Sequence, residues 1–109
     1  MGAVQAEVEV GAVADFEEGV IVPFEVGGEE VGVVSIRGRF YAFHNRCTHW
    51  GVALSEGYVN SANQVVCLYH DSSFDLRTGA AIGGPAPEDL PIYNVRVEAG
   101  RVLVSPPTS

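Results

Sequence analysis

Short apolar runs that alternate with polar residues, separated by turn residues, recur along most of the chain. In the first of them, Val8 and Val10 alternate with acidic residues and a glycine, which is typical of a half-buried strand. Further strands are predicted at 20–26, 29–36, 40–43, 64–68, 92–97 and 101–104. Many short strands with frequent turns predict an all-β fold, either a sandwich or a barrel.

Turn residues and segment lengths define the connections between these strands. Gly27-Gly28 predicts a tight hairpin between the second and third strands, and residues 98–100 predict another near the C-terminus. Residues 74–76 lead into a turn at 77–79, and residues 12–18 leave room for no more than one helical turn. Residues 105–109 are expected to form a flexible tail.

The length and composition fit a single small domain. The chain has 109 residues, of which 47% are hydrophobic, too many for a disordered protein. No run reaches the roughly 18 apolar residues that predict a membrane span. The N-terminus shows no basic region followed by an apolar stretch, so we expect no signal peptide and a cytoplasmic location.

The net charge narrows the range of partners. Fourteen acidic and six basic residues give a formal charge of −8 at pH 7. A nucleic-acid-binding protein needs a basic patch for the phosphates, so this balance argues against nucleic acid as a partner.

Two short pairs of metal-ligating residues carry the strongest chemical signal. They are Cys47-Thr48-His49 and Cys67-Leu68-Tyr69-His70, and they contain both cysteines of the chain. Four such side chains could close around a metal centre, either an iron–sulfur cluster or a single tetrahedral Zn²⁺. Zinc modules more often pair Cys with Cys and His with His, and the long β pattern supplies a core without zinc. His44, three residues before Cys47, could be a further ligand or a proton group, but it is interpreted as a surface residue or one that contacts a ligand.

The two pairs resemble the C-x-H and C-x-x-H half-motifs of the Rieske family, in which two His replace two Cys on one iron of a [2Fe–2S] cluster. Gly51, Leu54 and Gly57 extend the resemblance through the first cluster loop. Gly84-Pro85-Ala86 is similar to the proline-containing loop that covers the cluster in this family.

The resemblance implies a ligand set and a fold. Cys47 and Cys67 would bind one iron, and His49 and His70 the other. The implied fold is a Rieske-like antiparallel β sandwich in a single domain, residues 1–104, with a smaller cluster-binding insertion at about 44–86.

Details of the two cluster loops indicate which branch of the family the chain resembles. The extra cysteines of respiratory Rieske proteins are absent, so the chain resembles the disulfide-free ferredoxin branch. Asp71 stands where the family usually has Gly. High-potential members carry a Ser and a Tyr whose hydroxyls donate hydrogen bonds to cluster sulfur, and the matching residues here are Ser72 and Phe74. One donor is thus kept and one lost, which implies a potential in the lower part of the Rieske range of about −150 to +300 mV.

The family also implies a function and partners. The chain would be a monomeric one-electron carrier, not an enzyme, and would bind neither nucleic acid nor membrane. Its donor would be an NAD(P)H-dependent flavin reductase and its acceptor a terminal oxygenase of the ring-hydroxylating type. The acidic surface would dock on basic patches of both. The alternatives are a small subunit of a larger oxidoreductase such as a nitrite reductase, and the structural zinc module.

Overall fold

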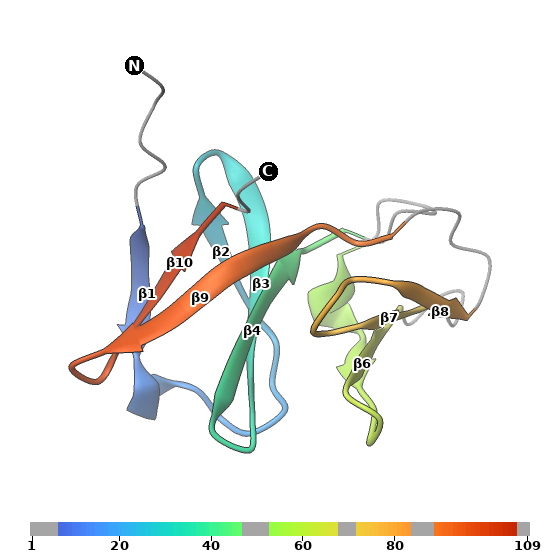
Figure 1. The fold of residues 1–109 in the computed structure, drawn as a ribbon, viewed down its shortest axis with the longest axis horizontal. Coiled ribbons are helices and arrows are strands. Elements are labelled where there is room, and N and C mark those ends of the chain that lie inside the picture. The colour runs from blue at the N-terminus through green and yellow to red at the C-terminus, as the bar shows by residue number, and fades with distance from the viewer. Residues whose placement is uncertain (1–6, 47–52, 68–71, 84–88, 107–109) are drawn as a thin grey trace.

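A computed structural model describes residues 7–46, 53–67, 72–83 and 89–106, which form two antiparallel sheets (Figure 1). The larger sheet has the strand order β1-β10-β9-β4-β3-β2, and the smaller has the order β5-β6-β7-β8. The strands of the larger sheet are β1 (Val8–Ala12), β2 (Val22–Val26), β3 (Glu29–Ile36), β4 (Arg39–His44), β9 (Ile92–Glu98) and β10 (Arg101–Ser105). Those of the smaller sheet are β5 (Tyr58–Val59), β6 (Gln64–Val66), β7 (Ser73–Asp75) and β8 (Ala81–Gly83). Two single 3₁₀ turns, η1 (Val13–Asp15) and η2 (Leu54–Glu56), lie between strands.

The predicted all-β fold and both predicted hairpins are confirmed. Strand β2 starts two residues later than expected, and the strand predicted at 64–68 ends at Val66, with position 68 outside the described residues. The sequence analysis missed β5 and β8. The former has two residues and the latter consists of Ala, Ile and Gly, so neither shows a recognisable alternation.

Strand β3 is buried on both faces and joins the two cores of the molecule. Val31 and Val33 point into a core between the two halves of the larger sheet, where they meet residues of β2, β4, β9 and β10. Val34 and Ile36 point the other way, into a core shared with the smaller sheet. The members of this second core that matter below are Phe43, Leu54, Cys67, Phe74 and Leu90. Strand β3 therefore contributes side chains to both cores.

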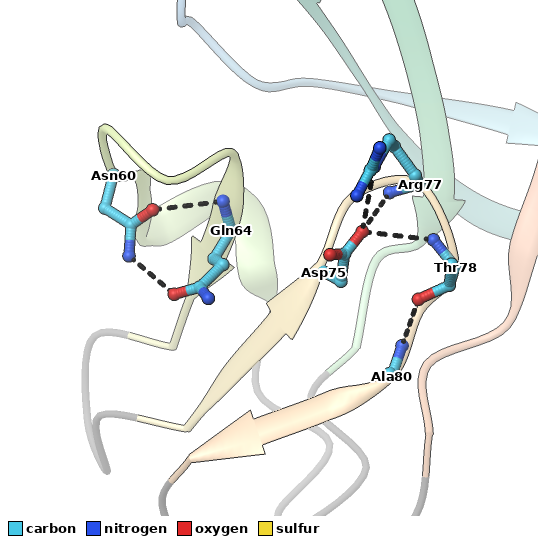
Figure 2. A network of polar contacts seen from close by, with 6 residues as sticks. All are labelled: Asn60, Gln64, Asp75, Arg77, Thr78 and Ala80. Carbon is cyan, nitrogen blue, oxygen red and sulfur yellow. Dashed lines mark hydrogen bonds and ion pairs between the residues drawn. The ribbon is translucent and has the colours of Figure 1, made fainter.

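Side-chain hydrogen bonds shape two turns of the smaller sheet (Figure 2). The Asn60 carboxamide oxygen accepts the backbone N–H groups of Ala62 and Gln64, each at 3.0 Å. The Asp75 carboxylate accepts the N–H of Arg77 at 2.7 Å and that of Thr78 at 3.3 Å. Asn and Asp favour such turns because their side chains can bond to the backbone two or three residues ahead.

The C-terminal end is more ordered than expected. We predicted a tail from residue 105, but Ser105 is the last residue of β10 and lies opposite Asn94. The Asn94 side chain also donates to the Pro106 carbonyl at 3.1 Å. Positions 107–109 lie outside the described residues. So do 47–52, 68–71 and 84–88, which include most of the predicted cluster loops. Within the described ranges, no helix has the length and apolar character needed to cross a membrane.

Candidate metal centre

A backbone hydrogen bond joins the two residues that flank segment 68–71. Cys67 follows β6 directly and Ser72 precedes β7, and the Cys67 N–H donates to the Ser72 carbonyl at 2.7 Å. The antiparallel pairing of β6 with β7 places these residues side by side, since Val66 lies opposite Ser73. The second Cys/His pair therefore begins at a fixed point of the smaller sheet.

A buried asparagine joins the residues that flank segment 47–52. The Asn45 side chain is fully buried; its oxygen accepts the Ser55 N–H at 2.7 Å and its amide donates to the Ser55 hydroxyl at 3.0 Å. The Leu54 N–H also points to the Asn45 carbonyl, at 3.4 Å. The sequence analysis missed this role. The available signal was a polar residue directly after an apolar strand and two positions before Cys47.

The third predicted loop is held in the same way on either side of segment 84–88. The Ala81 N–H donates to the Asp89 carboxylate at 3.0 Å, and the Leu90 N–H donates to the Gly79 carbonyl at 2.7 Å. Gly79 has φ +80°, and a Cβ there would overlap the Leu90 carbonyl oxygen. Glycine is required by both the backbone conformation and this close approach.

Residues from the flanks of the three segments contribute to one apolar core. Leu54, Cys67 and Leu90 each belong to a different flank, and all three are buried in the same apolar core. Gly57, which follows η2, lies against Val66 so closely that a Cβ would overlap the Val66 carbonyl oxygen. The fold thus anchors one flank of each predicted cluster loop in the same core.

Of the four predicted ligands, the structure describes one. Cys67 is buried, with 1% of its surface exposed, and its neighbours in the core are apolar. Cys47, His49 and His70 lie outside the described residues, as do Gly51, Asp71 and the predicted covering loop Gly84-Pro85-Ala86. His44 is described: its backbone N–H donates to the Pro91 carbonyl at 2.9 Å, and its ring Nδ1 lies 3.9 Å from a Glu29 carboxylate oxygen.

The burial and hydrogen bonding of the Ser72 hydroxyl show whether these residues fit an iron–sulfur cluster. Ser72 is fully buried, and its Oγ has no hydrogen-bond partner among the described residues. A buried hydroxyl without a partner is destabilising, so an acceptor is expected beside it. Phe74, the other position singled out above, is fully buried in the core and brings no hydroxyl. A buried cysteine sulfur next to a buried, unused donor fits a cluster with sulfur acceptors.

The comparisons with known proteins agree with this reading. The family described as the Rieske [2Fe–2S] domain matches residues 6–94. The chain belongs to this family. The ferredoxin subunit of 3-phenylpropionate/cinnamic acid dioxygenase from Escherichia coli (strain K12) is 36% identical over 95 residues, which cover 87% of this chain and 89% of that protein.

Solved structures of Rieske ferredoxins superpose closely on the fold. The ferredoxin of carbazole 1,9a-dioxygenase from Nocardioides aromaticivorans IC177 gives a TM-score of 0.90 at 32% identity, over 94% of this chain and 99% of that one. A ferredoxin solved in complex with the oxygenase of carbazole 1,9a-dioxygenase gives 0.87 at 28% identity, over 97% and 100% of the two chains. A nitrite reductase small subunit from Mycobacterium tuberculosis gives 0.87 at 21% identity, a likeness of fold alone.

Membership in the Rieske family settles the cofactor and the type of function. The predicted [2Fe–2S] cluster is confirmed, as is the prediction of an electron-transfer protein of the ferredoxin branch, not an enzyme. An iron–sulfur cluster, and not a structural zinc ion, is therefore the metal centre that this family indicates for the two Cys/His pairs. The identity of the four ligands stays a prediction, because three of them lie outside the described residues.

Proposed function

We propose that Cys47, His49, Cys67 and His70 hold the cluster and that the chain passes single electrons from an NAD(P)H-dependent flavin reductase to a terminal ring-hydroxylating oxygenase. The observation that carries the ligand assignment is that buried Cys67 shares one apolar core with Leu54 and Leu90, which lie in the flanks of the other two segments. When bound, the cluster accepts and releases one electron. Relatives named as dioxygenase ferredoxins, and one solved with its oxygenase, support the choice of partners. We propose that the chain acts in the cytoplasm as a monomer.

The residues around the proposed centre have separate tasks. Cys67 would hold one iron through its sulfur, and the Asn45–Ser55 hydrogen bonds keep the first cluster segment closed at its base. Leu54, Phe74 and Leu90 exclude water from the inner side, because each is at most 2% exposed. These contacts keep the ligand-bearing segments in place while the charge of the centre changes by one.

Ser72 is expected to raise the reduction potential. An electron added to the centre increases negative charge on sulfur, so a hydroxyl donor stabilises the reduced state more than the oxidised state. Ser72→Ala should lower the potential by roughly 40–90 mV, the equivalent of about 1–2 kcal/mol for one electron. A spectroelectrochemical titration of both proteins measures this difference.

Ser73→Ala is the matched control, because Ser73 is the adjacent buried serine at the start of β7. It removes a hydroxyl group from the adjacent position and should leave the potential within about 15 mV of wild type, well under the roughly 59 mV of a tenfold one-electron shift. An unchanged potential in Ser72→Ala would show that its hydroxyl points away from the sulfur.

An acidic groove beside the first cluster segment supports docking on a basic partner surface. It has a volume of about 580 Å³, lies between the β2–β3 hairpin and the end of β4, and is lined by Pro23, Phe24, Glu25, Gly28, Glu29, Glu30, His44 and Arg46. The Glu30 carboxylate pairs with Arg46 at 3.1 Å, while 60% of the Glu29 side chain is exposed. Arg46 directly precedes Cys47, so this groove adjoins the proposed centre along the chain.

The proposed function can be tested with the purified reductase and oxygenase components of a ring-hydroxylating dioxygenase. The chain should be reduced by the first component and should support product formation by the second. In the double variant Glu25→Gln/Glu29→Gln, the concentration of the chain needed for half-maximal rate should rise about three- to tenfold at low ionic strength, and this difference should fade in high salt.

Glu17→Gln provides a control for the loss of an acidic side chain outside the groove. Glu17 is exposed, and the adjacent Glu18 bridges to Ser35 near the end of β3 that lies opposite Glu29. It should leave the rate unchanged. A carrier that neither component recognises would contradict the assignment of partners.

A further inference from the structure

Three arginines gather where the larger and smaller sheets meet. Arg37 and Arg39 lie at the turn between β3 and β4, and Arg77 lies on the turn after β7 (Figure 2). Together with Ile36, Tyr41 and Asn63 they line a groove of about 200 Å³. Among the described residues, none that lines the groove is acidic, although the chain has 14 acidic residues and only six basic ones. Half of its positive charge therefore faces one small groove.

The ion pairs formed by the described residues leave the charge of these three arginines largely uncompensated. Outside the groove, Arg46, Arg96 and Arg101 each pair with a glutamate. At the groove, Arg77 approaches Asp75 only to 3.8 Å and stays 70% exposed. Within the described ranges, the side chains of Arg37 and Arg39 form no ion pair.

Two carboxylates lie near the groove, and both are engaged with the backbone. Both oxygens of Glu18 accept the Arg37 backbone N–H, at 3.0 and 2.9 Å. The Asp75 carboxylate accepts the N–H groups of Arg77 and Thr78. Neither residue lines the groove, and the polar residues that do are Arg37, Arg39, Tyr41, Asn63 and Arg77, all of which carry hydrogen-bond donors. Such a set of donors suits an oxyanion.

The groove lies at the ends of the strands that are remote from the proposed centre. Strand β4 begins at Arg39 and runs toward His44 and the first cluster segment. Asn63 precedes β6, which runs toward Cys67, and Arg77 follows β7, which starts after Ser72. A partner in this groove would leave the cluster segments accessible.

The size of the groove decides what kind of molecule it fits. Sites for whole small molecules usually measure about 300–1,000 Å³, more than this groove offers. It accommodates a single acidic group projecting from something larger. We propose that the arginine groove, defined by Arg37, Arg39 and Arg77, binds carboxylate side chains of an acidic segment on a partner protein. This site does not depend on the cluster ligands or on the redox partners proposed above.

Binding of a fluorescein-labelled hexaglutamate peptide to the cluster-loaded protein, followed by fluorescence anisotropy at low ionic strength, tests the proposal. Arg39→Gln and Arg77→Gln should each weaken binding about threefold, and the double variant about tenfold, as expected for exposed ion pairs. Arg37 is left in place because its backbone has φ +52°. Arg101→Gln, which removes one exposed charge from β10, should bind like wild type.

Three results would overturn the proposal. The first is no saturable binding to the wild-type protein, and the second is equal weakening in Arg101→Gln, which would reveal long-range charge alone. The third is displacement by inorganic phosphate as effective as by unlabelled peptide at equal ionic strength, which would make the groove a small-anion site. Each single variant alters an exposed side chain, and far-UV circular dichroism verifies its fold.

Discussion

Cys67→Ala is expected to yield a colourless protein with less than about a tenth of the iron and sulfide of wild type. Cys67 is buried in the apolar core to which the flanks of all three cluster segments contribute. Its loss would leave one iron with a single protein sulfur, and no other cysteine than Cys47 remains in the chain to replace it. Iron and acid-labile sulfide per chain, measured after anaerobic purification, give the result.

A pair of histidine variants extends the same test. His70→Ala should lose the cluster. His44→Ala should keep two irons per chain, because the ring of His44 lies near the Glu29 carboxylate and its backbone N–H is bonded to the Pro91 carbonyl. Retention of the cluster in His70→Ala together with its loss in His44→Ala would show that the ligand set is wrong.

Gly79→Ala is expected to be the most destabilising single substitution outside the ligands. The new Cβ would overlap the Leu90 carbonyl and force apart the β7–β8 turn and the chain that follows segment 84–88. Together with the positive φ, we expect a loss of about 4 kcal/mol or more, in the range reserved for severe backbone and packing defects. The midpoint of thermal unfolding should fall by more than about 15 °C. The visible absorption of the cluster should disappear at the same lowered temperature.

Gly100→Ala separates the steric clash from the backbone conformation. Gly100 has nearly the same φ, +77°, but a Cβ there would meet nothing within 4 Å. Its substitution should cost only about 1–2 kcal/mol, the penalty for a left-handed residue, and lower the midpoint by about 4–15 °C. Equal effects of the two substitutions would contradict the close packing of Gly79 against Leu90.

The sequence predicted those parts of the fold that have a local cause. Gly27-Gly28 predicted its hairpin because the glycines favour the backbone of a tight turn. Strands β5 and β8 were missed because their two and three residues become strands only through pairing with β6 and β7. Ser105 was expected to fray, but long-range pairing with Asn94 includes it in the sheet.

In the site, too, the sequence predicted the features with a local cause and missed those that depend on tertiary contacts. The Cys/His spacing predicted a metal centre, and the resemblance of the two pairs to the Rieske half-motifs implied the cluster, because this signal is local in the sequence. Asn45 could not be predicted, since its role depends on Ser55, ten residues away across the first cluster segment. The arginine groove is a purely tertiary feature: Arg37 and Arg77 are 40 positions apart in sequence and come together only when the sheets pack.

The central claim is that this chain holds a Rieske [2Fe–2S] cluster through two cysteines and two histidines. Electron paramagnetic resonance of the dithionite-reduced protein, with iron and sulfide quantified on the same sample, tests it most directly. We expect a rhombic signal with an average g clearly below 2 and two irons per chain. An EPR-silent, colourless protein with one zinc per chain, even after anaerobic preparation, would contradict the account.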